Sequence, residues 1–125
     1  YAVDARQAFY ERIVRGAFLE GYAQGLTPNP CLQCNRYIRF GLLLEHALAL
    51  GAEFLATGHY VRLHRPTGGA VRLLRGADPG KDQSYVLHVL TQEQLRRALF
   101  PVGVYPKSQV RALAQRFGLP VASRP

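Results

Sequence analysis

Two cysteines spaced three residues apart are the residues of this chain best suited to chemistry. Cys31 and Cys34 are the only cysteines among 125 residues, and they follow a segment, residues 27–30, that contains two prolines. Proline fixes φ and favours extended backbone in the residue before it, so the chain arrives stretched and then turns. A helix that begins at this turn places both thiols on one face, near the positive end of its dipole, which favours thiolate. We expect sulfur chemistry or a metal site here.

Other interpretations of the two cysteines stay open at this point. They are compatible with a buried structural pair of thiols, or with a zinc site. Zinc usually takes four ligands, and the histidines that could complete the set match no zinc-finger spacing; they are His46, His59, His64 and His88. Thioredoxin-like redox chemistry is less favoured, because it places the two cysteines directly after a strand, whereas a proline-containing loop precedes them here.

The composition indicates a basic globular domain with a polyanionic partner. The formal net charge is +8, the isoelectric point is about 10.1, and 48% of the residues are hydrophobic. Such an excess of cations suggests nucleic acid, although a solvated basic surface without a partner would have the same composition. Two cysteines make no disulfide framework, so a reducing cytoplasm is expected. No run approaches the roughly 20 apolar residues of a membrane span, and no secretory signal is visible.

Hydrophobic periodicity predicts the elements around the cysteines. A helix is expected over residues 5–23, ended by Gly25, and a second over residues 32–50, with Gly51 just beyond its end. Residues 53–60 are short and apolar with a glycine near the end, as in a buried parallel strand that stops at a binding crevice. A helix followed by such a strand is half of a doubly wound α/β unit. The buried stripe of the second helix is predicted to be Ile38, Leu42, Leu43, Ala47 and Leu50.

The second half of the chain begins with a predicted hairpin. Residues 61–65 alternate with period two, a Pro-Thr-Gly-Gly turn follows, and residues 71–75 are expected to be the returning strand, with a polar loop over 76–81. Residues 84–90 are expected to be helical. Thr91 and Gln94 form a predicted capping box for a helix that extends to about residue 99. A last helix is expected over 110–117, capped by Ser108 and ended by Gly118.

Several motifs, taken together and in order, resemble those of the tRNA-specific 2-thiouridylases, the MnmA family. No single motif is specific, but the combination is, and the resemblance covers nearly the whole chain. In chain order the motifs are Thr27-Pro28-Asn29-Pro30-Cys31-x-x-Cys34-Asn35, Arg39-Phe40-Gly41, Ala56-Thr57-Gly58-His59-Tyr60, Lys81-Asp82-Gln83-Ser84-Tyr85, Phe100-Pro101-x-Gly103 and Gly118-Leu119-Pro120-Val121-Ala122.

The resemblance implies a fold and an activity. The fold class would be α/β, a Rossmann-like adenine-nucleotide α-hydrolase (PP-loop ATPase) fold that is partial here and followed by a β-hairpin and a helical segment. Residues 1–60 would be part of the catalytic domain, and residues 61–125 a tRNA-contacting region. The activity would be ATP-dependent 2-thiolation of the wobble uridine, with Mg²⁺, by adenylation of the C2 oxygen and sulfur transfer from a cysteine persulfide. Partners would be tRNA and an upstream sulfur-carrier protein or cysteine desulfurase relay, with no membrane.

The resemblance also assigns roles to individual residues. Cys34 matches the first catalytic cysteine, and Gly58 matches a contact to ATP. With a third cysteine, Cys31 and Cys34 could instead be ligands of a [4Fe-4S] cluster, and the sequence does not decide between persulfide and cluster. Residues that match tRNA contacts are Asn29, Pro30, Cys31, His59, Lys81, Asp82 and Gln83.

Two family features lie outside this sequence. The pyrophosphate loop, Ser-Gly-Gly-x-Asp-Ser, would precede Tyr1, and the second catalytic cysteine would follow Pro125. We therefore expect the chain to be a central part of the enzyme and inactive by itself. A non-catalytic basic RNA-binding module with a CxxC metal site is the alternative, and a related sulfurtransferase that acts on another base is a third hypothesis. Beside the cysteines, the chain combines cations with an aromatic ring, in Arg36, Tyr37 and Arg39. Such a combination suits a splayed anticodon base, which can stack on the ring.

Overall fold

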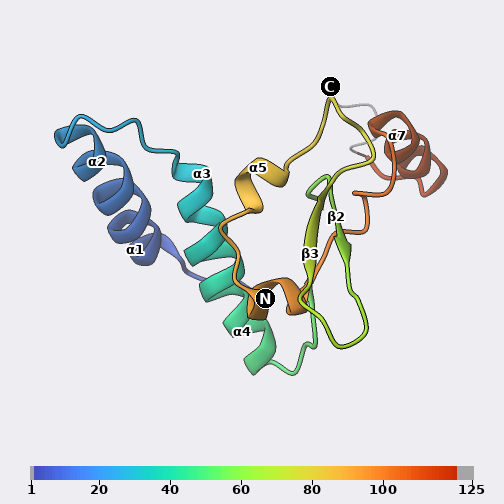
Figure 1. The fold of residues 1–125 in the computed structure, drawn as a ribbon, viewed down its shortest axis with the longest axis horizontal. Coiled ribbons are helices and arrows are strands. Elements are labelled where there is room, and N and C mark those ends of the chain that lie inside the picture. Colours follow the sequence, from blue (N-terminus) through green and yellow to red (C-terminus); the bar gives the residue numbers. More distant parts are fainter. Residues whose placement is uncertain (1, 121–125) are drawn as a thin grey trace. The chain divides into compact units, whose positions relative to one another are not determined.

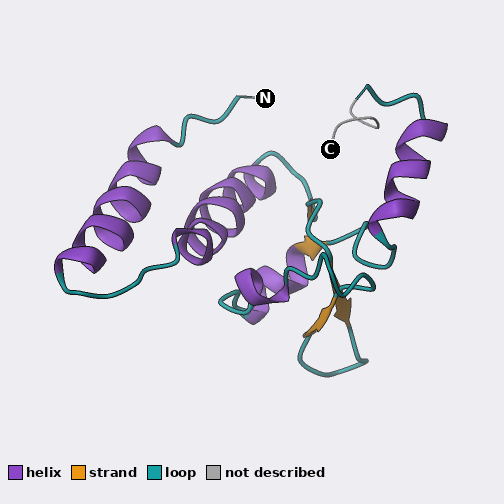
Figure 2. Cartoon of the chain, turned by 90° about the horizontal axis from the view of Figure 1, so that it is seen from above, coloured by secondary structure: helices purple, strands orange, loops and turns teal. Residues whose placement is uncertain are grey.

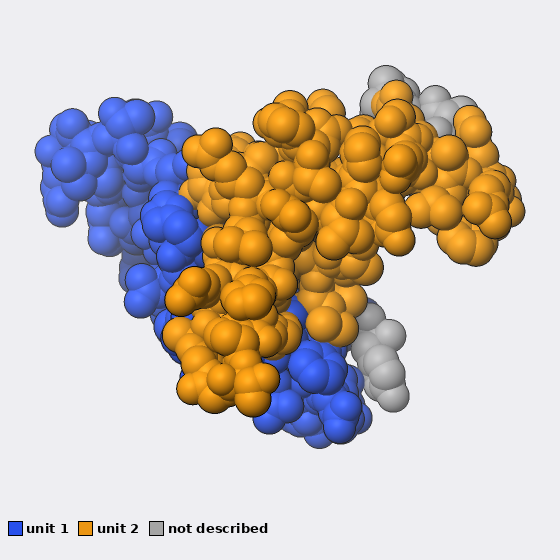
Figure 3. Space-filling view, turned by 45° about the vertical axis from the view of Figure 1, so that its right-hand side comes forward, with its two compact units in different colours: residues 1–55, 86–98 blue, residues 56–85, 99–125 orange. Residues whose placement is uncertain are grey.

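The computed structural model describes residues 2–120. Contacts divide the chain into two compact units, which Figure 3 shows in different colours. The first unit comprises residues 1–55 and 86–98, and the second comprises residues 56–85 and those from 99 onward. Because the chain passes between them more than once, neither unit is a continuous segment. We describe each unit by itself.

Two long helices form most of the first unit (Figure 1). The elements α1 (Arg6–Phe9), η1 (Tyr10–Leu19) and α2 (Glu20–Ala23) follow without a break, as do α3 (Pro30–Gln33), η2 (Cys34–Leu43) and α4 (Leu44–Ala49). The helices pack antiparallel, since α1 contacts η2 and η1 contacts α3. Gly25 and Gly51 follow the two helices with φ of 73° and 88°, in the left-handed region that glycine enters without strain. Both predicted helices are thus confirmed, with ends shifted by two residues or fewer.

The predicted buried stripe of the second helix is wrong, and the winding explains why. The segment η2 is π-helical, with i→i+5 hydrogen bonds in place of i→i+4 bonds. Wider winding brings residues five apart onto one face, and the buried positions are Asn35, Phe40 and then Leu44. The predicted stripe is half-buried up to Ala47, and Leu50 is exposed.

A short helix from the end of the first unit is tied to this long helix. The helix α6 (Gln92–Arg97) begins with the predicted capping box: Thr91 Oγ1 accepts from Gln94 N, and Gln94 Oε1 accepts from Thr91 N. The same Gln94 donates from Nε2 to the carbonyl oxygens of Arg36 and Phe40, at 3.0 and 2.9 Å. One glutamine therefore both caps α6 and satisfies carbonyl groups of η2.

Short strands and a C-terminal helix mark the second unit (Figure 2). The predicted hairpin is confirmed: β2 (Val61–His64) pairs antiparallel with β3 (Arg72–Arg75), with Val61 opposite Arg75. The strand predicted over 53–60 is only β1 (Leu55–Ala56), which pairs with β4 (Ala98–Leu99) in a second two-stranded sheet. In chain order, α5 (Ser84–Leu87) lies between β3 and β4.

The last helix starts earlier than the sequence predicts. The helix α7 spans Lys107–Arg116 with Pro106 at its N-cap, and no side chain caps it. Ser108 lies inside the first turn, so its predicted capping role is wrong. Gly118 has φ of 64°, as expected for the residue that ends a helix. Within the described residues, no helix is long and apolar enough to cross a membrane.

Close main-chain approach shapes the second unit around the start of β2. Val61 is fully buried, and Gly76 and Gly103 are buried beside it. A Cβ atom added to Gly76 would lie 2.5 Å from the carbonyl oxygen of Tyr60, and one added to Gly103 would overlap that of Val61. Both positions therefore require glycine for steric reasons.

Candidate functional site

The cysteine segment opens the second long helix, as the sequence predicts. Asn29 is the N-cap of α3, and its Oδ1 accepts a hydrogen bond from Cys31 N at 3.1 Å. Pro30 occupies the first helical turn, where its missing N–H leaves no helical bond unmade. Cys31 is exposed, Cys34 is half-buried, and both thiols are free. The segment thus presents one open thiol and one shielded thiol at the start of a helix.

Buried hydrogen bonds hold the helix just after Cys34. Asn35 is 3% exposed, and its Nδ2 donates to the carbonyl oxygen of Val86 at 3.2 Å. Arg39 donates from Nη1 to Asn35 Oδ1 at 2.8 Å. Arg39 was expected to contact RNA, but this guanidinium is engaged in supporting Asn35. The amide in the Cys-Asn pair therefore has a structural reason, which is to fix the helix next to the thiol.

An aromatic ring flanked by two cations lies on the same helix. The guanidinium carbons of Arg12 and Arg36 each lie 5.3 Å from the centroid of the Tyr37 ring. The three side chains line a cavity of about 410 Å³ in the first unit. The cation and aromatic mixture predicted beside the cysteines is present for Arg36 and Tyr37, and the structure adds Arg12 to it.

The second unit contains a polar cavity of about 580 Å³ that gathers most of the other predicted residues. Gly58 forms part of its wall, and Tyr60, Tyr85, Lys107 and Arg111 extend it. The motif that was expected to bind tRNA also contributes to the wall, namely Lys81, Asp82 and Gln83. Sequence segments separated by more than twenty residues are therefore brought together around one cavity.

Two of the residues predicted to contact tRNA, Asp82 and Gln83, use side-chain oxygen atoms in hydrogen bonds within the protein. Asp82 Oδ1 accepts from the main-chain N–H of Gly76 at 2.8 Å, and its Oδ2 accepts from Ser84 Oγ at 2.7 Å. Gln83 Oε1 accepts from Tyr60 N at 3.0 Å. These bonds shape the wall of the cavity, whereas Lys81 is exposed and its side chain is available to a ligand.

The environment of Asp82 lowers the pKa of its carboxyl group. Partial burial acts to raise the pKa, but the hydrogen bonds from Ser84 and Gly76, together with the charge of Arg75, outweigh it. A carboxyl group whose pKa is lowered by folding stabilises the fold at pH values above its ordinary pKa of about 3.9. That contribution is lost as the pH falls through the folded-state pKa.

We therefore expect Asp82→Asn to lower the melting temperature at neutral pH and to matter less in acid. The difference between wild type and variant should narrow as the pH falls from about 6 to about 3, because the wild-type carboxylate is then protonated. Thermal melts across this pH range measure it. A difference that stays constant over the range would contradict the role given to the charge of Asp82.

His59 is buried rather than exposed. It is 8% exposed, its Nδ1 lies 2.8 Å from Thr57 Oγ1, and its ring meets Phe100 edge-on at 6.1 Å between centroids. These contacts orient the segment that carries Gly58. The structure therefore gives His59 a packing role beside the cavity.

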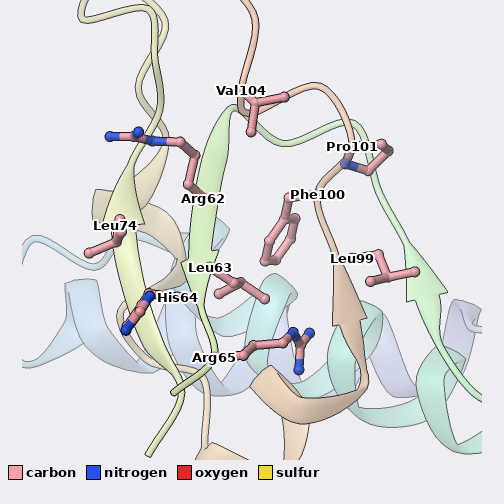
Figure 4. A pocket seen from close by; sticks show the side chains of 9 residues that line it. All are labelled: Arg62, Leu63, His64, Arg65, Leu74, Leu99, Phe100, Pro101 and Val104. Carbon is pink, nitrogen blue, oxygen red and sulfur yellow. The ribbon is translucent and has the colours of Figure 1, made fainter. Parts of the chain in front are cut away.

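A second cavity in the same unit, of about 440 Å³, is apolar with basic residues at its edge. Figure 4 shows Leu63 of β2 and Phe100 at the centre of the view, with Leu99 and Pro101 to their right and Val104 above them. Arg62 Nε donates to the carbonyl oxygen of Arg75, so this arginine also fastens the hairpin. None of the residues predicted for the functional site lines this cavity within the described part of the chain.

Sequence reasoning missed Lys107 and Arg111 as cavity residues. Their four-residue spacing indicates that they share a helical face, but nothing local shows which loop that face meets. The connection is made by Asp78, whose Oδ2 accepts from Lys107 N at 2.9 Å and whose Oδ1 accepts from Gly80 N at 3.0 Å.

The cysteines alone do not make up a metal site. Within the described residues, no group of three or more His, Cys, Asp or Glu side chains could hold a metal ion. A [4Fe-4S] cluster is held by several cysteine thiolates, so Cys31 and Cys34 would need further ligands.

Comparison with known proteins places the chain in a family. Residues 1–125 match the family model described as the tRNA methyl transferase HUP domain. The "tRNA-specific 2-thiouridylase MnmA" of Geobacter metallireducens is 53% identical over 124 residues, which are 99% of this chain and 33% of that protein. The protein of that name from Thermus thermophilus is 50% identical over 125 residues, 100% of this chain and 32% of its own length. The "tRNA-specific 2-thiouridylase MnmA 1" of Caldanaerobacter subterraneus is 54% identical over 125 residues, 99% of this chain and 34% of its own length.

The chain spans about a third of the length of the curated relatives that it matches. The family match confirms the expected fold class, an α/β Rossmann-like nucleotide-binding fold that is partial here. It also covers every motif on which the resemblance to 2-thiouridylases was based. This chain belongs to the tRNA methyl transferase HUP domain family.

Proposed function

We propose that this chain provides the cysteine segment and an RNA-binding cavity of an ATP-dependent tRNA-uridine 2-sulfurtransferase. The observation that carries the proposal is the identity of about 50% over nearly the whole chain to proteins named tRNA-specific 2-thiouridylase. The family model is described by methyl transfer, but thiolation requires thiols, and the free thiols of Cys31 and Cys34 supply them.

The proposed reaction replaces the C2 oxygen of the wobble uridine with sulfur. ATP adenylates that oxygen and releases pyrophosphate, the outer sulfur of a cysteine persulfide then attacks C2, and the oxygen leaves with AMP. The thiol of the other catalytic cysteine attacks the inner sulfur, which breaks the S–S bond, releases 2-thiouridine and forms a disulfide that a thiol reductant reopens. Cys34 is the catalytic cysteine of this chain, because its thiol is shielded yet reachable at the start of a helix. Asn29 fixes that helix start, and with Pro30 and the exposed Cys31 it forms the segment that meets the target base.

Gly58 is the proposed contact to ATP. A Cβ atom added here would meet nothing within 4 Å, and the residue does not have positive φ. Folding therefore does not require glycine at this position, whereas close approach of a nucleotide to the main chain would. The Mg²⁺ that accompanies ATP would be held mainly by phosphate and water oxygens.

The proposed tRNA contacts differ in what they can offer. Lys81 is exposed and suits a phosphate, while Asp82 and Gln83 mainly shape the loop that presents it. His59 can reach RNA only through the 8% of its surface that is exposed. We propose that residues 1–60 serve the catalytic domain and that residues 61–125 serve tRNA contact.

The sulfur source and the compartment complete the proposal. A sulfur-carrier protein or a cysteine desulfurase relay would load the persulfide, and the cytoplasm would keep both thiols reduced. If a [4Fe-4S] cluster is used instead, Cys31 and Cys34 are the ligands that this chain would give to it.

The test is formation of 2-thiouridine by a full-length enzyme that carries this segment. We expect thiolated tRNA and AMP in the presence of ATP and a persulfide donor, and neither product when ATP is omitted. Transfer of a methyl group without incorporation of sulfur would overturn the proposal.

Binding of tRNA should weaken with salt, in part through Lys81. Each phosphate contact contributes about 0.7 to 0.9 to the slope of log affinity against log salt, so Lys81→Ala should lower the slope by that amount. Filter binding at several salt concentrations measures the slope, and an unchanged value would remove Lys81 from the contacts.

A further inference from the structure

The polar cavity of the second unit has a wall that the motifs do not include. Among the described residues that line it, Lys81 comes from the loop, and Lys107 and Arg111 come from α7. The single carboxylate among the described lining residues belongs to Asp82, which is engaged by main-chain and hydroxyl donors. The cavity is therefore strongly positive.

Contacts along α7 hold the added cations at the cavity. Lys107 is anchored through its main-chain N–H to Asp78, and its Nζ lies 5.6 Å from the centroid of the Tyr60 ring. Arg111 lies four residues on, which places it on the same helical face. Within the described residues, neither Lys81 nor Lys107 forms an ion pair.

An exposed aromatic ring accompanies the cations. Tyr85 lines the same cavity and is 64% exposed. Cations beside an exposed ring are the combination that binds unpaired RNA, since the cations bind phosphates and the ring stacks on a base. ATP also has phosphates for the cations and a base that can stack, and Gly58 lines the same cavity, so the test below measures both ligands.

We propose that Lys107 and Arg111 form, with Lys81, a phosphate-binding wall for unpaired RNA, and that Tyr85 stacks on one of its bases. This inference rests on the proposed function and adds residues of α7 that the motifs do not assign. The ligand is the RNA backbone, and the phosphates of ATP are the competing source.

The test measures tRNA affinity at several salt concentrations with a full-length enzyme and its Lys107→Gln and Arg111→Gln variants. Each substitution should lower the salt slope by about 0.7 to 0.9, and the double variant by about twice as much. Arg116→Gln, on the same helix but outside the cavity lining, is the matched control and should leave the slope unchanged. Lys107→Arg keeps the charge and should keep the slope. This variant distinguishes an effect of the lost charge from an effect of misfolding. Tyr85→Ala should weaken binding about tenfold, and Tyr85→Phe should not.

Three other outcomes would each overturn the inference. Unchanged slopes in both glutamine variants of a protein that binds tRNA would refute it while the proposed function stands. Weaker ATP binding with an unchanged tRNA slope would assign the cations to the nucleotide instead. Failure of the wild-type enzyme to bind tRNA at all would refute the proposed function and this inference together.

Discussion

Replacement of Cys34 by serine should reduce 2-thiouridine formation to the uncatalysed background in a full-length enzyme that carries this segment. A hydroxyl group cannot carry or receive persulfide sulfur, and it is a far weaker nucleophile than thiolate at neutral pH. The half-buried position of Cys34 should let serine fit without loss of stability, because the two side chains differ by one atom. The measurement is mass spectrometry of nucleosides from tRNA after reaction with ATP and a sulfur donor.

Cys31 provides the matched control for this substitution. Its thiol is exposed, and it lies one helical turn before Cys34. We expect Cys31→Asp to keep much of the activity, since a carboxylate can replace a thiolate as a polar contact or metal ligand. In Cys31→Ala, with anaerobic preparation and iron measured in the same sample, activity without iron supports persulfide transfer, whereas joint loss of both supports a cluster. Wild-type activity in Cys34→Ser would remove Cys34 from the reaction.

Substitution of Gly103 by alanine should unfold or severely destabilise the second unit. A Cβ atom at this position would overlap the carbonyl oxygen of Val61 and lie 2.5 Å from its carbonyl carbon. The colliding atoms belong to the main chain of a fully buried residue, so no side-chain rotation relieves the overlap. Overpacking commonly costs about 1 to 3 kcal/mol, and we expect a loss of about 3 kcal/mol or more here. Thermal melting of full-length variants measures the loss, with the yield of soluble protein as a second observable.

Gly58→Ala is the control for the Gly103 prediction. It adds the same methyl group in the same unit, but nothing lies within 4 Å of the new atom. Its melting temperature should match that of wild type, while its affinity for ATP falls if Gly58 contacts the nucleotide. Equal stability of the Gly58 and Gly103 variants would contradict the main-chain overlap.

The sequence by itself determined the features that depend on near neighbours. Helix periodicity predicted both long helices, and Gly25 and Gly51 marked their ends, because glycine enters the left-handed region without strain. Alternation around a glycine-containing turn predicted the hairpin, and Thr91 with Gln94 predicted a capping box. The helix start at the cysteines followed from the two prolines, and the structure adds Asn29 as its N-cap.

Only the tertiary structure decided how these local features are used. The π-helical winding placed Asn35 and Phe40 at the buried positions of the second long helix. The side-chain amides of Asn35 and Gln94 donate hydrogen bonds to carbonyl oxygens of distant segments, which no local pattern encodes. His59 became a buried support because Phe100, forty-one residues later, packs against it.

The candidate RNA site likewise depended on contacts between distant segments. The loop that carries Lys81 and the helix that carries Lys107 and Arg111 form one cavity because Asp78 accepts hydrogen bonds from both sides. Sequence spacing shows which residues share a helical face. Only long-range hydrogen bonds and packing show what that face meets.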